Sequence, residues 1–321
     1  MKIKQPITEA QTTTMRSTTS ALRRSFIQFH HVQRLLEKME DLLSQDITVE
    51  EADNLFIVGE SGVGKSWLLK KFLGIHPHVK HDDYTEIPVL YTSVPSKSSI
   101  DDLASAMLLS MGSPFWNRGK TKDLTAQLYT LLKACRVRMI ILDEVNHLVD
   151  KGGVKTHYLL ADWLKLLTEE ARIPIVLAGI PRATRLLETN EQFRGRFREV
   201  VPIKPFSVED DRLMAEFQGV MKAFKGLIPE LLKVDISGSE LTHRFAFASA
   251  GRLREIRRLL VRVVELAYRN SSGQATLQTF AAAFKEIIYP GASDERNPFT
   301  DKFNQVPLTR PGEPFAPRVE A

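Results

Sequence analysis

The stretch that decides the fold is IVGESGVGKS, residues 57–66. It matches the pattern G-x-x-x-x-G-K-[ST] through Gly59, Gly64, Lys65 and Ser66. Glycines let a loop turn so that its backbone N–H groups face phosphate oxygens, and the positive end of a following helix adds to the attraction. An apolar run precedes the loop and a helical pattern follows it, which is the context that this motif requires. The stretch therefore predicts a phosphate-binding loop between a strand and a helix.

The residue types in this loop indicate ATP and Mg²⁺ as its ligands. The Lys65 ammonium group is expected to reach the β- and γ-phosphates, and the Ser66 hydroxyl to ligate Mg²⁺. Trp67 stands directly beside the loop, at the start of the helical pattern. We expect the ATP site to include Asp143, from a second stretch, and nine consecutive residues of this loop: Gly59, Glu60, Ser61, Gly62, Val63, Gly64, Lys65, Ser66 and Trp67.

A second stretch, MIILDE at residues 139–144, supplies the acidic groups. Asp143 ends an apolar strand and is expected beside the phosphate loop, where a carboxylate holds Mg²⁺ through water. Glu144 follows directly and is placed to orient and deprotonate the attacking water. The alternative for Glu144 is a helix-capping acid, because such acids are common after strands. Loop and acidic strand end together indicate an NTPase with Lys65 and Glu144 in catalytic roles.

Short apolar runs alternate with helical patterns through the middle of the chain. This alternation predicts an α/β fold with a mainly parallel five-stranded sheet covered on both faces. The expected strands are 55–58, 88–91, 139–142, 174–178 and 200–203. After Pro205 only helical patterns remain, at 208–225, 238–249, 252–269 and 276–288.

These patterns divide the chain into four parts. Residues 1–48 are expected to form a mobile N-terminus followed by an amphipathic helix over 21–44. Residues 49–206 form the α/β nucleotide-binding core, and residues 207–289 form a small helical lid. The remaining residues, 290–321, contain six prolines and are expected to be disordered.

The composition is that of a globular protein without membrane segments. Apolar residues make up 43% of the chain and charged residues 26%, which are ordinary values. The net charge of +5 and the pI of about 9.2 permit a nucleic-acid partner without demanding one. No apolar run approaches the ~20 residues of a membrane span, the first residues lack the apolar stretch of a secretory signal, and the single Cys135 forms no internal disulfide. We expect a cytoplasmic protein.

Arginines at two places are candidates for contact with phosphates. Arg194, Arg196 and Arg198 crowd the segment where a ring-forming ATPase places an arginine finger for its neighbour's nucleotide. We favour Arg196, because Phe197 after it can anchor the turn; the alternative is a solvated basic stretch. Arg254 lies in a G-x-x-R pattern at a helix start and is expected to lie over the phosphates of its own nucleotide.

In order along the chain, these motifs resemble those of an AAA+ ATPase and, more narrowly, of the TnsC/TniB family of transposition regulators. The matching pieces span about residues 50–260: GESGVGKS, MIILDEVNHLVD, IPIVLAGIPRATRLL, NEQFRGRFREV, KPFS and SAGRLREIRRL. LDEVNHLVD, AGIPRA and the late NPF are similar to the branch found in CRISPR-associated transposons. The chain departs from the general AAA+ pattern at Ile180, where a polar residue is usual, and weak hydrolysis would follow from that.

The resemblance implies an ATP-dependent regulator that self-associates on double-stranded DNA as rings or filaments. It connects a target-selector protein to the transposase, and slow hydrolysis controls disassembly. The resemblance also implies DNA contacts after the second strand; Lys97, Lys120, Thr121 and Lys122 are our candidates for binding backbone phosphates. The alternative is that these are ordinary exposed loop residues. The tail either docks on transposase or selector proteins or is inert.

Two other functions stay open from the sequence. A helicase-loader or clamp-loader ATPase would hydrolyse ATP quickly and form closed rings. A non-hydrolysing adaptor would hold ATP only as part of its structure. The behaviour of a Glu144→Gln variant separates these possibilities, because only a hydrolysing protein needs the carboxylate.

Overall fold

The computed structural model describes residues 8–45, 52–96, 99–150, 154–228, 235–269 and 274–317. Lys97, one of the predicted DNA contacts, lies outside these residues. The chain forms two compact units. The core unit comprises His30–Ser61 and Lys65–Lys204, and the C-terminal unit comprises Met1–Phe29, Gly62–Gly64 and Pro205–Ala321.

The core unit is built on a five-stranded sheet in the order β4-β5-β6-β1-β7. Every neighbouring pair in this sheet is parallel. The predicted α/β fold with a parallel five-stranded sheet is therefore confirmed. The strands are β1 (Leu55–Val58), β4 (Val89–Ser93), β5 (Met139–Asp143), β6 (Ile175–Gly179) and β7 (Glu199–Pro202). An antiparallel hairpin of β2 (Val79–Lys80) and β3 (Thr85–Glu86) was not predicted, because two-residue strands leave no periodic signal.

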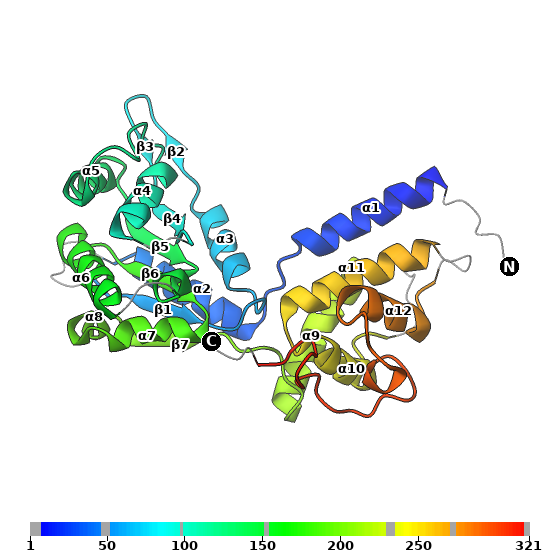
Figure 1. Ribbon diagram of the computed structural model, residues 1–321. Coiled ribbons are helices and arrows are strands. Elements are labelled where there is room, and N and C mark those ends of the chain that lie inside the picture. The colour runs from blue at the N-terminus through cyan, green and yellow to red at the C-terminus, as the bar shows by residue number, and fades with distance from the viewer. Residues whose placement is uncertain are drawn as a thin grey trace. The chain divides into compact units, whose positions relative to one another are not determined.

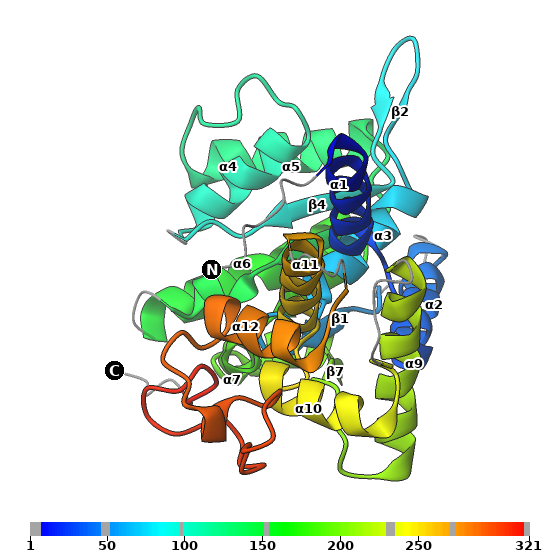
Figure 2. The same cartoon turned by 90° about the vertical axis from the view of Figure 1, so that its right-hand side faces the viewer.

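Helices lie on both faces of this sheet. Figures 1 and 2 show α2 and α3 on one side, and α4, α5 and α6 on the other. The helices of the core unit are α2 (His30–Leu43), α3 (Lys65–Ile75), α4 (Ile100–Ser110), α5 (Thr121–Ala134), α6 (Val154–Ala171), α7 (Arg185–Glu188) and α8 (Glu191–Arg196). Two 3₁₀ turns, η1 (Val145–Leu148) and η2 (Pro181–Thr184), follow β5 and β6.

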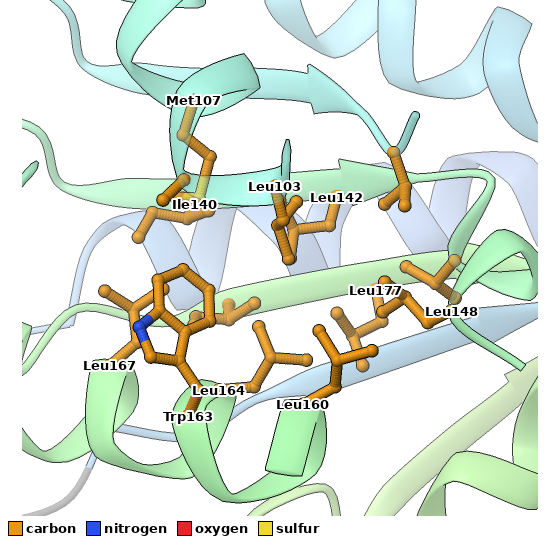
Figure 3. Close-up of a cluster of buried hydrophobic side chains, with 14 of the residues drawn as sticks. Leu103, Met107, Ile140, Leu142, Leu148, Leu160, Trp163, Leu164, Leu167 and Leu177 are labelled. Carbon is orange, nitrogen blue, oxygen red and sulfur yellow. The ribbon is translucent and has the colours of Figure 1, made fainter. Parts of the chain in front are cut away.

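In the core beneath α6, side chains of this helix pack against side chains of the sheet. Its buried side chains recur at helical spacing: Leu160, Trp163, Leu164 and Leu167. They point at alternate residues of the strands, including Ile140, Leu142 and Leu177, with side chains of α4 beyond them (Figure 3). Burial of these apolar side chains is the main stabilising contribution to this unit, at about 25 cal/mol per Å².

The C-terminal unit is a helical bundle built around α11. It contains α1 (Glu9–Arg24), α9 (Asp211–Leu227), α10 (Ser239–Ser249), α11 (Leu253–Arg269), α12 (Leu277–Ile287) and the 3₁₀ turn η3 (Asp294–Arg296). Helix α11 packs against α1, α10 and α12, and Figure 1 shows α1 running alongside it. The bundle buries apolar side chains from each of the helices α9 to α12.

Two predictions for the N-terminus are wrong. Residues 9–20 are helical rather than mobile, because α1 begins with a capping box in which the Thr8 side chain accepts from the backbone N–H of Gln11. The continuous helix over 21–44 is also interrupted, between Arg24 and His30. Ile27 and Phe29 in that interval pack into the C-terminal unit, whereas α2 belongs to the core unit. The chain passes from the C-terminal unit to the core unit in this interval. Local periodicity in the sequence does not indicate such a crossing.

The prediction of a disordered tail is wrong for residues 290–317. The buried guanidinium of Arg296 pairs with both carboxylate oxygens of Glu313, at 2.7 Å each, and donates to the carbonyl oxygen of Pro307 at 2.9 Å. Asn297 is buried and donates to the carbonyl oxygen of Ala281 at 3.0 Å. These paired contacts supply order that proline content alone does not predict.

The NPF segment, for which docking and an inert tail were both left open, is buried in the structure. Phe299 is buried, with its ring centroid 5.4 Å from those of Phe245 and Phe280. Arg244 donates to the carbonyl oxygens of Pro298 and Thr300 at 2.7 and 3.0 Å. The segment is thus part of the hydrophobic core of the C-terminal unit.

Among the glycines compared in the described part of the chain, Gly251 leaves the least room for a side chain. Its φ is +65°, and a Cβ atom there would lie 1.9 Å from the carbonyl oxygen of Phe206. We predict that Gly251→Ala lowers the free energy of unfolding of the C-terminal unit by about 2 kcal/mol or more. Gly219→Ala in α9 is the matched control, because a Cβ atom there meets nothing within 4 Å, and it should stabilise by about 0.5–1 kcal/mol. Denaturant melts followed by circular dichroism measure both; equal effects would contradict the steric explanation.

Candidate nucleotide and DNA sites

The phosphate loop follows β1 and opens α3, as its sequence predicts. Gly62 and Gly64 have φ values of +88° and +116°, which glycine adopts without steric cost. The N–H of Gly59 donates to the carbonyl oxygen of Gly179 at 3.1 Å. This bond fixes the first residue of the loop against the end of β6.

The other loop residues differ in their exposure. Val63 is buried, Glu60 and Ser61 are not, and Trp67 is half-buried on α3. All nine residues predicted to bind ATP thus lie on one strand–loop–helix turn at the carboxyl end of β1.

The Lys65 side chain lies over this loop. It is 7% exposed, and its Nζ donates to the carbonyl oxygen of Gly59 at 2.6 Å and to that of Glu60 at 3.1 Å. These bonds hold a buried ammonium group over the turn, next to Ser66 at the amino end of α3. Ammonium, helix end and glycine backbone together favour a bound phosphate chain.

Asp143 ends β5 and is 2% exposed. Its Oδ1 accepts the N–H of Glu144 at 2.9 Å, and its Oδ2 accepts the hydroxyl of Tyr91 at 3.0 Å. Burial, followed by the charge of Asp143 and the hydrogen bond to it, raises the pKa of the Tyr91 phenol well above its ordinary value. The phenol therefore stays protonated and orients the Asp143 carboxylate.

Tyr91 is a site residue that the sequence did not reveal. It lies in the middle of β4, 52 positions before Asp143 in the chain. Tyrosine is common in strands, so the residue type alone gives no signal. Only the pairing of β4 with β5 shows that this hydroxyl can reach Asp143.

Glu144 adopts the left-handed conformation, with φ 58° and ψ 37°. A non-glycine residue in this region costs on the order of 1 kcal/mol, and such strain concentrates at functional positions. Glu144 stands at the cap of η1, but among the described residues its side chain makes no capping hydrogen bond. The helix-capping alternative for Glu144 therefore finds no support in the structure.

Gly179, the last residue of β6, has no room for a side chain. A Cβ atom at Gly179 would lie 2.9 Å from both the Val145 Cγ2 and the Ala183 Cβ atoms. Ile180 after it starts η2. The η1 and η2 turns thus occupy the space that a polar side chain would need at position 179.

Arg254 lies against the tip of the phosphate loop. Its backbone N–H donates to the carbonyl oxygen of Gly62 at 2.9 Å, and a Cβ atom at Gly62 would lie 3.2 Å from the Arg254 Nε. The Arg254 Nε donates to Oε1 of the buried Glu255 at 2.9 Å, and Arg258 donates to Oε2 at 2.9 Å. One buried carboxylate thus holds two guanidinium groups at the start of α11.

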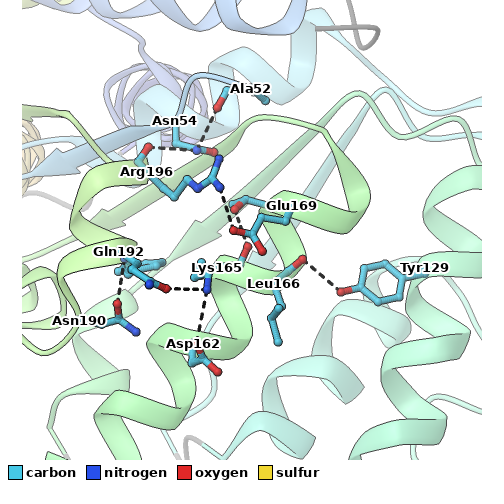
Figure 4. Close-up of polar contacts among 12 residues, drawn as sticks. Ala52, Asn54, Tyr129, Asp162, Lys165, Leu166, Glu169, Asn190, Gln192 and Arg196 are labelled. Atoms are coloured by element: carbon cyan, nitrogen blue, oxygen red, sulfur yellow. Dashed lines mark hydrogen bonds and ion pairs between the residues drawn. The ribbon is translucent and has the colours of Figure 1, made fainter. Parts of the chain in front are cut away.

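The three candidate finger arginines have different surroundings at the end of α8. Arg196 pairs with Glu169 of α6 at 2.8 Å, and its carbonyl oxygen accepts from Asn54 at 3.1 Å (Figure 4). Arg194 is exposed and lies 3.7 Å from Glu191. Arg198 is exposed and donates to the carbonyl oxygen of Gly195 at 3.2 Å.

Asn54 is a further residue that sequence reasoning missed. Its Oδ1 accepts the N–H of Ile175 at 2.8 Å, and its Nδ2 donates to the carbonyl oxygens of Ala52 and Arg196. This buried amide ties the base of the Arg196 segment to β6 (Figure 4). Its position directly before the apolar strand was the one available signal.

The predicted DNA contacts lie at the start of α5. Lys120 and Lys122 are exposed, but the Thr121 hydroxyl donates to Asp101 of α4. Asp123 accepts the backbone N–H of Lys120 at 2.9 Å. The structure therefore brings the two lysines together on one exposed turn and gives the Thr121 hydroxyl an acidic partner.

The donor set at the loop fits a nucleotide-bound Mg²⁺ ion. Ser66 offers a hydroxyl oxygen and Asp143 a carboxylate, and oxygen ligands of this kind suit Mg²⁺. Among the described residues, no group of three or more His, Cys, Asp or Glu side chains could hold a metal ion. Within the same residues, no helix is both long and apolar enough to cross a membrane.

Solved structures share this fold. Cdc6p from Pyrobaculum aerophilum matches with a TM-score of 0.62 and 16% identity, over 86% of this chain and 72% of that one. The ORC1 protein of Aeropyrum pernix, solved in complex with DNA, gives 0.60 and 16%, over 85% and 69%. Drosophila ORC bound to DNA gives 0.59 and 15%, over 92% and 70%. Together with the sheet order and the phosphate loop, these likenesses define an AAA+ ATPase fold.

The family is narrower than the fold. The family described as bacterial TniB protein matches residues 19–207, more than half of the chain. This protein belongs to the TniB family of transposition-associated AAA+ proteins. A search of curated proteins found no match.

The Tyr91 hydroxyl gives a test of the acidic strand end. We predict that Tyr91→Phe weakens Mg²⁺-dependent ATP binding about tenfold, because a partner that orients a metal-site carboxylate is lost. Binding of a fluorescent ATP analogue, with Mg²⁺ and with a chelator, measures the effect, and the chelated affinity should stay unchanged. Tyr129→Phe is the control, since that hydroxyl belongs to α5 and lies 3.5 Å from the Leu166 carbonyl oxygen of α6. Equal Mg²⁺ dependence in both variants would contradict the assignment.

Proposed function

We propose that this protein is an ATP-dependent regulator of DNA transposition. It assembles on double-stranded DNA as rings or filaments and connects a target-selection protein to the transposase, and ATP hydrolysis controls disassembly. The observation that carries the proposal is a complete phosphate loop beside the Asp143–Glu144 strand end in a chain of the TniB family. The narrower origin in a CRISPR-associated transposon rests on the sequence resemblance alone.

The core unit supports ATP hydrolysis at the carboxyl end of its sheet. Lys65 neutralises phosphate charge, and Ser66 and Asp143 would hold Mg²⁺, which supplies charge neutralisation between the phosphates when bound. Glu144 takes the proton of the attacking water as general base. Ile180, where the general AAA+ pattern has a polar residue, offers no side-chain donor to orient this water, which favours slow hydrolysis.

Self-association completes the site through an arginine of the adjacent subunit. Arg196 is the proposed finger, because Asn54 fixes its backbone to the sheet while its side chain is 24% exposed. Arg254 is the proposed contact to the phosphates of its own subunit, since it lies against Gly62 of the loop. An arginine finger commonly contributes about 10³–10⁵ in rate.

Binding of DNA is proposed for the exposed turn that carries Lys120 and Lys122. Ammonium groups on an exposed turn bind backbone phosphates without reading sequence. Two proteins that share the fold, ORC1 of Aeropyrum pernix and ORC of Drosophila, were solved bound to DNA, which is compatible with this role. The loader-like ATPase that the sequence leaves open is the second candidate. The buried Asn297 and Phe299 leave the tail's NPF out of any docking contact in this conformation.

Electron microscopy of the protein with linear duplex DNA tests the proposal. We predict rings or filaments that need both ATP and DNA and that weaken as salt rises, because phosphate contacts release counterions. Lys65→Ala should abolish ATP binding and assembly. Glu144→Gln should keep binding, reduce hydrolysis at least about hundredfold and lengthen the lifetime of assemblies.

Three outcomes would overturn this function. Full assembly by the Lys65→Ala variant would show that ATP does not control it. Closed rings with fast turnover would support the loader-like ATPase instead, and unchanged lifetimes for Glu144→Gln would support an adaptor that does not hydrolyse ATP.

The ion pair between Arg196 and Glu169 gives an independent prediction. Arg196 has to exchange or share its carboxylate partner before it contacts a neighbour's phosphates. We predict that Glu169→Gln lowers the protein concentration needed for ATP-dependent assembly by up to about fivefold, since a partly exposed pair contributes about 1 kcal/mol at most. Arg196→Ala should instead reduce ATP turnover by assemblies about a hundredfold or more.

Glu170→Gln is the matched control for this pair. It makes the same charge change one position along α6, on an exposed side chain. Light scattering against protein concentration compares Glu169→Gln with Glu170→Gln, and an ATPase assay of the assemblies measures Arg196→Ala. A higher concentration requirement for Glu169→Gln than for Glu170→Gln would contradict the prediction.

A further inference from the structure

An exposed aromatic side chain stands among the cations of the α4–α5 turn. Phe115 is 50% exposed, and the Arg118 guanidinium lies 5.1 Å from its ring centroid. Trp116 beside it packs instead against the core of the unit. The turn therefore separates its two aromatic residues, one inward and one outward.

The turn is built to hold this arrangement. The backbone N–H of Arg118 donates to the carbonyl oxygen of Phe115 at 3.0 Å, closing a tight turn. The buried Ser113 hydroxyl oxygen accepts from the Phe115 N–H at 3.2 Å and from Gln127 of α5 at 2.9 Å. Gly119 has a φ of +108°, and a Cβ atom there would lie 2.6 Å from that of Asp123. Phe115 is thus displayed by a fixed turn rather than by a loose loop.

The surroundings of Phe115 are positively charged. Arg118, Lys120 and Lys122 are all exposed on this turn. The nearby carboxylates make hydrogen bonds of their own: Asp101 accepts from the Thr121 hydroxyl, and Asp123 accepts from the Lys120 backbone. An exposed ring beside one guanidinium group, with two lysines on the same turn, matches a polyanion that also offers flat apolar faces, which is nucleic acid.

We propose that Phe115 makes an apolar contact with the bases of the DNA duplex, while Arg118, Lys120 and Lys122 hold the flanking phosphates. This inference rests on the proposed DNA binding and adds a contact of a different kind. Exposed aromatic side chains insert against base steps, and burial of the ring against the bases offsets the cost of partial unstacking. Arg118 keeps the ring in place until DNA binds.

The two kinds of contact respond differently to salt. Each phosphate contact releases counterions, so its loss reduces the slope of log K against log salt concentration by about one. An apolar contact with a base releases none. Phe115→Ala should therefore lower DNA affinity about five- to fiftyfold at every salt concentration and leave the slope unchanged.

The experiment is fluorescence anisotropy with a labelled duplex at several salt concentrations, in the presence of ATP and Mg²⁺. Tyr158→Ala is the matched control, because Tyr158 on α6 is equally 50% exposed and lies outside the cationic turn. Phe115→Leu should restore most of the affinity, since it keeps an apolar side chain. A 2-aminopurine base in the duplex should brighten on binding to the wild-type protein and less so with Phe115→Ala.

Each contrary outcome is distinct. Wild-type affinity for Phe115→Ala would overturn the contact, and a reduced slope would show that Phe115 acts only through Arg118. Weaker assembly of Phe115→Ala with ATP in the absence of DNA would assign the ring to a protein interface instead. If the wild-type protein itself fails to bind the duplex, the proposed function fails rather than this inference alone.

Discussion

The parallel direction of all five strands is the constraint on which the core unit depends. It places the carboxyl ends of β1, β5 and β6 on one edge, with β6 between the other two. The bond from the Gly59 N–H to the Gly179 carbonyl oxygen joins the phosphate loop to that edge. Because β5 ends there too, Asp143 comes to the same edge as Lys65 although 78 positions separate them in the chain.

Close packing at this edge determines which side chains can stand there. The η1 turn brings Val145 so near to β6 that position 179 accepts no side chain. The same turn begins at Glu144, whose left-handed backbone is strained. The edge thus keeps its acidic groups at the end of β5 and offers none from β6.

Glutamates hold both arginines that we propose as phosphate ligands. Glu169 pairs with Arg196, and the buried Glu255 pairs with Arg254. The half-buried pair of Arg196 and Glu169 contributes about 1 kcal/mol at most, so its exchange for a phosphate contact costs little. The buried Glu255 keeps Arg258 as a partner when Arg254 turns to a phosphate. The contrast with Arg296 is informative, because its bidentate pair with Glu313 is buried and fixes the tail instead.

The amino-acid sequence by itself determined the strands, the phosphate loop and the acidic strand end, because each depends on local periodicity or on residue types at fixed spacing. Only the tertiary structure decided the break between Arg24 and His30, the burial of the tail around Phe299, and the partners of Asp143 and Arg196. Tyr91, Glu169 and Glu313 reach their partners across 17 to 52 positions of the chain. Such pairings depend on which strands and helices pack together, and no local pattern in the sequence records that packing.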